Sequence, residues 1–414
     1  MESSSYSRIW RWHFYSGLFL SPTLLTLAIT GLVYLFKPQI EPMIYRHWLE
    51  VPKAETTISA QAQLDSAMSA FPESRLKNVI PSLGAGKSMQ VFLEDKTNTE
   101  MIVYVNPHKR DIVGSQKADK TLMQLMHDIH GSLLIGKPGE IIMEMTAGFA
   151  FILVTTGLFL WWPKDRKSLA GVLWPRFDLK GRGWWKDFHA VPAFYLSSLI
   201  FLFLITGLPW TGINGDILKT IGEKTGTGSP LGFGGSPYQS VQIPSQPKID
   251  LDRLLQISRE KLPGIPATIL LPKKEGGAAV IRWKAPRPQD RAYIHVDMFT
   301  GEIIKDFRWK DFGVIGKFIL MAVALHEGTW FGIWNQILNS IVALGVIGLA
   351  ISGIVLWWKR KPPHSFLSAP QVSDGSSFPK SLVVLIGIFC VLVPVTGISL
   401  IVILIVDSVI RKVN

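Results

Sequence analysis

Two stretches of the chain decide its fold: RWHFYSGLFLSPTLLTLAITGL, residues 11–32, and KDFHAVPAFYLSSLIFLFLITGL, residues 186–208. Each places a histidine, His13 or His189, at the start of an apolar run that is long enough to cross a membrane. In both stretches a Thr-Gly pair begins 17 residues after the histidine (30 − 13 and 206 − 189). Because an ionisable side chain is costly inside a bilayer, a histidine at this place predicts a functional site.

The composition predicts an integral membrane protein. Of the 414 residues, 48% are hydrophobic and only 18% are charged. Many of the Lys and Arg residues behind the formal net charge of +12 gather beside apolar runs, as in WWKRKPPH at 357–364. This distribution is the positive-inside pattern of membrane proteins, so the charge implies no nucleic-acid partner.

A single cysteine, Cys390, lies inside an apolar run. One cysteine excludes an internal disulfide, a cysteine-based zinc site and a covalently attached haem. The N-terminal apolar run is too long for the hydrophobic region of a signal peptide, and no small-residue cleavage site follows it. We therefore expect this run to be retained as the first transmembrane helix.

The fold class that we predict is an integral membrane α-helical bundle of about five spans with two small outer α+β domains. Each outer segment contains two alternating apolar runs separated by a turn, at 89–114 and 278–304, which predicts hairpins. The basic stretches place the N-terminus in the cytoplasm and the C-terminus outside. The predicted helices are 1–36, 140–162, 189–212, 332–358 and 380–414, the outer domains are 37–139 and 213–331, and the cytoplasmic loops are 163–188 and 359–379.

The chain also reads as an internal parallel duplication. His130 and His326 each precede a Trp-Trp pair by 31 residues (161 − 130 and 357 − 326), just as His13 and His189 share their spacing to Thr-Gly. The repeated unit is helix, outer domain, helix, and a fifth helix is appended. Two spans per unit give both units the same orientation, so equivalent residues are expected at the same depth.

Of the roles that we considered for the histidines, ligation of iron fits the sequence best. Neutral imidazole binds iron, copper and zinc well, but compact non-haem sites add Asp, Glu or Cys, which the spans almost lack. His13 and His130 are expected at opposite faces of the membrane, so they cannot share a haem. We therefore predict two non-covalent haem b groups, one between His13 and His189 near the cytoplasm and one between His130 and His326 near the outer face.

Small residue pairs accompany every span. They are Thr30-Gly31, Thr156-Gly157, Thr206-Gly207, Ser352-Gly353 and Thr396-Gly397. Such pairs let helices pack closely in lipid, and their glycines can also give a macrocycle room. Because the fifth span has the pair without a histidine, helix packing is the favoured interpretation.

Four further residues are secondary candidates. His127 lies three residues before His130, on the same helical face, and is a further candidate ligand. Arg8, Arg11 and Arg182 flank the cytoplasmic pair and are candidate partners of haem propionates. Positive-inside loop charge explains these arginines equally well.

The outer stretches VYVNPHKRDIVG and IHVDMFTGEII resemble PepSY domains, and the histidine-bearing spans that end in WWP and WWK resemble the PepSY-associated transmembrane helix family. This family includes iron-regulated inner-membrane proteins and ferric-siderophore reductases of the FoxB type. The resemblance implies a multi-pass haem protein of the bacterial inner membrane that reduces ferric siderophores, of an expected hydroxamate type, on the periplasmic side. Its span-entry histidines match His13, His130, His189 and His326.

Two other functions remain open at this stage: a siderophore or metal transporter, and a regulatory membrane protein whose outer domains bind a partner. A transporter needs polar residues at mid-membrane, where this chain has mostly Thr and Ser, and a regulator needs no histidines at both faces. No dinucleotide or flavin fingerprint is present. Electrons would therefore come from a membrane quinol or from a separate partner.

Overall fold

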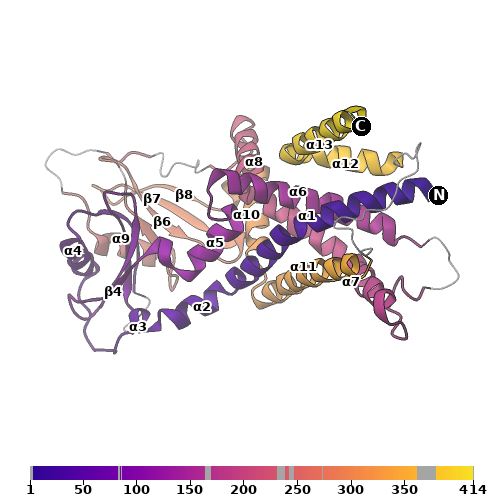
Figure 1. The fold of residues 1–414 in the computed structure, drawn as a ribbon. Helices are drawn as coiled ribbons and strands as arrows, with labels where there is room; N and C mark the ends of the chain where they lie inside the picture. Colours follow the sequence, from indigo (N-terminus) through magenta and orange to yellow (C-terminus); the bar gives the residue numbers. More distant parts are fainter. Residues whose placement is uncertain are drawn as a thin grey trace.

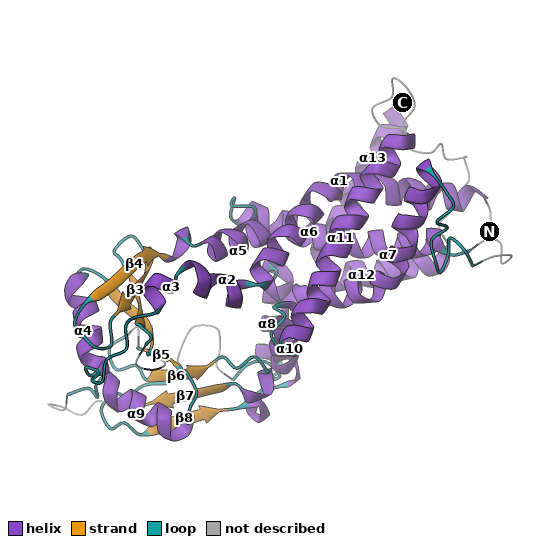
Figure 2. Ribbon diagram, turned by 90° about the horizontal axis from the view of Figure 1, so that it is seen from below, coloured by secondary structure: helices purple, strands orange, loops and turns teal. Residues whose placement is uncertain are grey.

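The computed structural model of the chain describes residues 3–82, 84, 86–163, 169–230, 238–241, 247–272, 274–360 and 379–413. An antiparallel sheet and a bundle of long helices lie at opposite ends of an elongated molecule (Figure 1). Both chain ends lie at the end of the bundle away from the sheet (Figure 1, Figure 2). Parts of the two predicted cytoplasmic loops, 164–168 and 361–378, are outside the described residues.

Among the described residues, four helices are long and apolar enough to cross a membrane. Helix α1 packs against α6 and α11, and α7 packs against the same two helices, so α1 and α7 face each other across the bundle. The four helices are α1 (Ser3–Leu35), α6 (Lys137–Trp161), α7 (Gly181–Gly207) and α11 (Ile333–Arg360).

Shorter helices lead from the bundle to the sheet. Helix α5 ends where Leu133 and Leu134 adopt positive φ angles of 51° and 62°, and this turn sends the chain back into α6. The amide of Leu133 donates to the carbonyl of Ile129, which closes the last turn of α5. These helices are α2 (Lys37–Ile44), α3 (Arg46–Leu49), α5 (Leu122–Ser132), η2 (Leu208–Trp210), α8 (Gly212–Lys224) and α10 (Val314–His326).

The predicted fifth span is not one continuous helix. It consists of α12 (Lys380–Leu392) and α13 (Pro394–Val413), which lie side by side against α6. The chain breaks at Pro394 because proline lacks the backbone N–H that would continue the helix. As a result the end of α13 lies toward the same end of the bundle as the start of α1 (Figure 1), and the side of the membrane on which the C-terminus lies stays a prediction.

The two outer segments form a single sheet instead of two separate domains. The strand order is β4-β3-β2-β1-β5-β6-β7-β8, and all pairs are antiparallel. Strands β1 and β5 join the halves through the pairs Asn78–Leu270 and Val79–Ile269. The strands are β1 (Arg75–Ile80), β2 (Met89–Glu94), β3 (Glu100–Val105), β4 (Ile112–Lys117), β5 (Thr268–Leu270), β6 (Ala279–Trp283), β7 (Ala292–Val296) and β8 (Ile303–Phe307).

Both halves of the sheet share one hydrophobic core. Every second residue of the central strands is buried, and these residues pack under α4 (Ala60–Ala70) and α9 (Leu251–Lys261). The sheet region also contains three short 3₁₀ turns, which are η1 (Ala118–Lys120), η3 (Pro288–Asp290) and η4 (Trp309–Asp311). Figure 2 shows α4 and α9 on the side of the sheet away from the bundle.

The two covering helices also cap each other. The carboxylate of Asp252, in α9, accepts hydrogen bonds from the backbone N–H groups of Ala60 (2.8 Å) and Gln61 (3.1 Å) at the start of α4. In return, the Gln61 side-chain oxygen accepts from the N–H of Leu251 at the start of α9 (2.9 Å). Because the first N–H groups of a helix lack partners of their own, this exchange stabilises both helix ends and joins the halves.

A buried carboxylate makes a similar link inside the bundle. Glu144, on α6, is only 1% exposed. It accepts hydrogen bonds from the backbone N–H groups of Ile213 and Asn214 and from the Asn214 amide, at the start of α8. The helix N-terminus thus compensates a charge that would otherwise be costly at this depth.

We expect Asp252→Ala to destabilise the sheet part by about 2 kcal/mol, because it leaves two amides without their charged acceptor. The measurement is thermal unfolding of the purified protein followed by fluorescence. Glu73→Ala is the control, since its ion pair with Lys96 is exposed on both sides and such pairs contribute less than about 1 kcal/mol. Equal shifts for the two variants would show that the exchange of caps does not join the halves.

Candidate functional site

The first pair of histidines lies at the end of the bundle near the chain termini. His13, on α1, and His189, on α7, have ring centres 6.4 Å apart, and their ring planes are nearly perpendicular, at 82°. The two rings meet across the bundle because α1 and α7 stand on opposite sides of it. We call His13 and His189 the terminal-side pair.

The second pair lies at the end of the bundle near the sheet. His130, near the end of α5, and His326, the last residue of α10, also have ring centres 6.4 Å apart, with an angle of 65° between the rings. We call them the sheet-side pair. Along α1, His13 and Thr30, which contacts His130, are separated by 17 residues, or about 26 Å of helix. The two pairs therefore lie at well-separated depths.

Each histidine docks on a Thr-Gly or Ser-Gly pair of a neighbouring helix. In all four cases the ring nitrogen Nδ1 lies within 3.4 Å of the hydroxyl oxygen of that pair. The four contacts are His13 with Thr156 (3.1 Å), His130 with Thr30 (3.1 Å), His189 with Ser352 (2.9 Å) and His326 with Thr206 (3.4 Å).

The glycine of each pair makes room for the imidazole. A Cβ atom on Gly31 would lie 3.0 Å from Cε1 of His130, and on Gly157 it would lie 3.1 Å from Cε1 of His13. The corresponding distances are 3.1 Å for Gly207 and His326, and 3.6 Å for Gly353 and His189. A side chain at three of these positions would push the ring out of place. The small pairs are therefore docking sites for histidines, a role that neither sequence interpretation included.

Hydrogen bonding fixes which ring nitrogen carries the proton. Nδ1 of His13 lies 3.1 Å from the carbonyl oxygen of Leu153, and Nδ1 of His326 lies 3.2 Å from that of Phe203. A carbonyl oxygen only accepts hydrogen bonds, so Nδ1 must donate in both residues.

The same conclusion holds for the other two histidines by a different route. The hydroxyl of Thr30 donates its proton to the carbonyl of Thr26, and the hydroxyl of Ser352 donates to that of Leu349. With their protons already engaged, these hydroxyls can only accept from His130 and His189. In all four imidazoles Nδ1 thus carries the proton, and the lone pair is on Nε2.

The Nε2 lone pairs are available for a metal. In the described part of the chain, no hydrogen bond involves Nε2 of any of the four histidines. An imidazole nitrogen lies about 1.1 Å from its ring centre and about 2 Å from a bound metal ion, so two imidazoles on one ion have centres about 6 Å apart. Both observed separations, 6.4 Å, fit this value.

The donor set fits a metal that brings its remaining ligands with it. Across the described ranges, no cluster of three or more His, Cys, Asp or Glu side chains could hold a metal ion. Each pair offers only two nitrogens, one from each histidine. A macrocycle such as haem would bring its other nitrogen ligands with it, so the residues present fit this group.

The fifth small pair shows what these residues do without a histidine. Thr396-Gly397, in α13, packs against α6, where a Cβ atom on Gly148 would collide with Thr396. The Thr396 hydroxyl is buried and has no hydrogen-bond partner among the described residues. For this pair the packing interpretation from sequence is the correct one.

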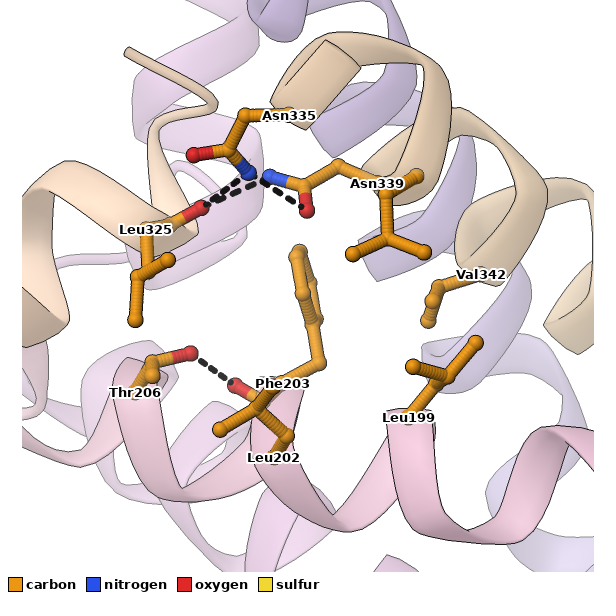
Figure 3. Close-up of a pocket in the computed structure, with 9 residues that line it drawn as sticks. Leu199, Leu202, Phe203, Thr206, Leu325, Asn335, Asn339 and Val342 are labelled. Atoms are coloured by element: carbon orange, nitrogen blue, oxygen red, sulfur yellow. Dashed lines mark hydrogen bonds between the residues drawn. The ribbon is translucent and has the colours of Figure 1, made fainter. Parts of the chain in front are cut away.

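The backbone that carries His326 is held in place by two buried amides. The side chains of Asn335 and Asn339, on α11, donate to the carbonyl of Leu325 at 3.1 and 2.8 Å, and Asn339 also donates to that of His326 at 3.1 Å (Figure 3). These carbonyls at the end of α10 have no partner within the helix. The cavity beside them, which Phe203 also lines, measures about 20 Å³ and holds at most one water molecule.

His127 is more exposed than the sheet-side pair and has contacts of its own. Its side chain is 50% exposed, and its Nδ1 lies 3.1 Å from the carboxylate of Asp128. Its ring centre is 5.9 Å from that of Tyr34. His127 therefore lies beside α1, with its Nδ1 already engaged by Asp128, and its role as a ligand stays a prediction.

The predicted arginine partners lie at the terminal-side end, and a residue that sequence reasoning missed joins them. Arg11 lies 5.6 Å from the ring centre of Tyr15 on its own helix. Arg182 is close enough to Arg360 to affect it electrostatically. The guanidinium of Arg360 lies 3.6 Å from the ring centre of Trp10. The sequence signal for Arg360 was its place two residues after the Trp357-Trp358 pair, although loop charge explained it there.

Residues 10–360, most of the chain, match a family that is described as PepSY-associated TM region. The match spans both pairs of histidines and the whole sheet. None of the curated proteins matches the chain. The sequence match and the fold therefore agree on a membrane protein in which sheet segments interrupt the series of histidine-bearing helices. The chain belongs to the PepSY-associated TM region family.

Proposed function

We propose that the protein binds two haem b groups and carries electrons across the inner membrane to reduce ferric siderophores on the periplasmic side. The observation that carries this proposal is the pair of facing imidazoles at each end of the bundle, with ring centres 6.4 Å apart and their protons fixed on Nδ1. Such geometry suits a metal bound between two Nε2 atoms.

The protein's own residues have three tasks in this function. Nε2 of each histidine would hold the iron, and the hydroxyl of each Thr or Ser would keep the ring in the correct tautomer and orientation. The glycines and the apolar bundle exclude water from the site. When bound, haem supplies one-electron chemistry by cycling between iron(III) and iron(II).

The sheet-side pair is where we place electron delivery to the substrate. The sheet stands over this end of the bundle, and the resemblance to ferric-siderophore reductases supplies the substrate class. One electron converts the chelated iron(III) to iron(II), which such chelators bind weakly, so the metal is released. Electrons enter at the terminal-side pair from a membrane quinol or from a separate donor.

An optical spectrum of the purified protein tests the proposal first. We expect a sharp Soret band that shifts on reduction with dithionite, resolved α and β bands, and about two haems per chain, as four axial histidines require. Adding a ferric hydroxamate siderophore to the reduced protein should restore the oxidised spectrum. A colourless protein after haem-replete expression would overturn the proposal. A coloured protein that the siderophore does not reoxidise would show that this siderophore is not its substrate.

Replacing one histidine at a time should show which haem each pair of histidines holds. We expect His326→Ala to lose about one of the two haems, because one imidazole remains to hold the iron. His13→Ala should lose the other, with a different residual spectrum. The measurement is a pyridine haemochrome count with a redox titration.

His127→Ala is the matched control, since it removes an imidazole from the same helix as His130, one that is half exposed and contacts Asp128. It should retain both haems. Loss of a haem in this variant would contradict the assignment of the sheet-side ligands.

Removal of a docking hydroxyl should weaken one site only. We expect Thr30→Val to reduce haem affinity at the sheet-side pair by about 10-fold or more, since the His130 ring loses an acceptor that orients it. A less basic imidazole stabilises iron(III) less, so the midpoint potential of this haem should rise. Spectral redox titration measures both effects.

Thr396→Val makes the same chemical change in the pair that has no histidine. It should leave both haems unchanged, because the Thr396 hydroxyl has no hydrogen-bond partner among the described residues. If Thr30→Val behaved like Thr396→Val, the hydroxyl would have no part in holding His130.

A further inference from the structure

The face of the sheet opposite α4 and α9 carries two buried polar atoms that have no hydrogen-bond partner in the described part of the chain. They are Oδ1 of Asn78, on β1, and Nε of Arg282, on β6. Asn78 pairs with Leu270, which pairs with Val280, and Val280 and Arg282 alternate along β6. Both side chains therefore lie on the same face, one from each half of the sheet.

This face is the one that turns toward the helices leading to the bundle. The alternate residues of β6, Ala279 and Ile281, are fully buried in the core under α4 and α9. On the opposite face, Trp48 of α3 packs over Tyr104 and occupies the position of a side chain at Gly114. Arg282 thus belongs to the surface between the sheet and the bundle.

Arg282 is a half-buried cation without an anion. Burial lowers the pKa of its guanidinium, because desolvation disfavours the charged form and the described residues supply no carboxylate to compensate it. Carboxylates elsewhere in the sheet already have cations: Glu94 pairs with Arg75, and Asp306 with Arg308. An uncompensated charge in such a place is costly unless a ligand neutralises it.

Neutral hydrogen-bonding groups flank Arg282 in the strand register. Thr268, on β5, and Tyr293, on β7, stand directly beside it on the same face. Their hydroxyls can donate to an oxygen that the guanidinium holds. A fork of Arg donors with hydroxyls on both sides matches the two oxygens of a carboxylate.

The same strand leads to the sheet-side pair. Lys284, which follows β6, forms an ion pair of 3.2 Å with Glu327, the residue directly after His326. The strand that carries Arg282 is therefore linked, through this ion pair, to the residue that follows a predicted iron ligand.

We propose that Arg282, with Thr268 and Tyr293 beside it, is a carboxylate-binding site on the bundle-facing side of the sheet. Asn78, two strands across and two residues along from Arg282 or about 12 Å away, provides an acceptor for a hydroxyl or N–H group of the same ligand. The ligand class is an anionic ferric chelate that carries carboxylates and hydroxyls, and this identity rests on the proposed function. A carboxylate at this place can also come from a propionate of the haem at the sheet-side pair.

Binding of two probes to the full-length protein tests the site. The probes are ferric citrate, which is anionic and rich in carboxylates, and an uncharged ferric tris-hydroxamate, and tryptophan quenching gives their Kd. We expect R282Q to raise the Kd for ferric citrate about tenfold or more and to change that for the uncharged chelate less than about twofold. R282K should lose part of the affinity for ferric citrate, because lysine keeps the positive charge but lacks the forked N–H donors of the guanidinium. N78L should also raise the Kd for ferric citrate.

K305Q is the matched control. Lys305 is a cation on the same face, two strands from Arg282, and it is exposed. K305Q should leave both Kd values unchanged. The thermal unfolding midpoint of each variant shows whether the sheet is still folded.

A redox titration separates the two sources of the carboxylate. If Arg282 holds a haem propionate, R282Q should lower one of the two midpoint potentials, the one that H326A abolishes, and N78L should not change it. If R282Q alters neither a Kd nor a midpoint potential, or if K305Q has the same effect as R282Q, the site is overturned. The citrate measurement needs no haem, so it still decides the proposal if the wild-type protein proves colourless.

Discussion

The structure depends on where a single proton sits in four imidazoles. Each Nδ1–H points at a hydroxyl or carbonyl of a neighbouring helix, which fixes the ring and leaves Nε2 without a hydrogen-bond partner among the described residues. The glycine beside each hydroxyl allows this approach, and the long helices supply the spacing between the two levels. Helix packing, ring orientation and the ligand geometry therefore share the same few contacts, and a change in any of them affects the others.

Much of this arrangement could be predicted from the sequence, because apolar runs and fixed spacings are visible there. His13 and His189 stand at equal distances before Thr-Gly pairs, and the structure brings these histidines together, as it does His130 and His326. The role of Thr30, Thr156, Thr206 and Ser352 was not recognised, although the same spacing carried the signal. The reason is that small residues in a membrane helix usually serve packing, and only contacts between different helices distinguish the two roles.

The union of the outer segments could not be predicted in this way. Each half contains a plausible hairpin, but the joint between β1 and β5 depends on two edge strands that are almost 200 residues apart in the chain, and β5 has only three residues. Edge strands present free N–H and C=O groups, and the sequence does not say which partner satisfies them. The break at Pro394 was visible, but its consequence, a return of the chain along α12, depends on packing against α6.

The division of each pair between the two halves of the chain has a consequence for biosynthesis. A nascent chain that has inserted its first two long helices already contains His13 and His130, but these lie at different depths and neither has a partner. The terminal-side pair is complete only once His189 has been made, and the sheet-side pair only once His326 has been made. Each pair therefore needs helices from both halves of the chain: the terminal-side pair cannot form before α7 has been made, and the sheet-side pair cannot form before α10 has been made.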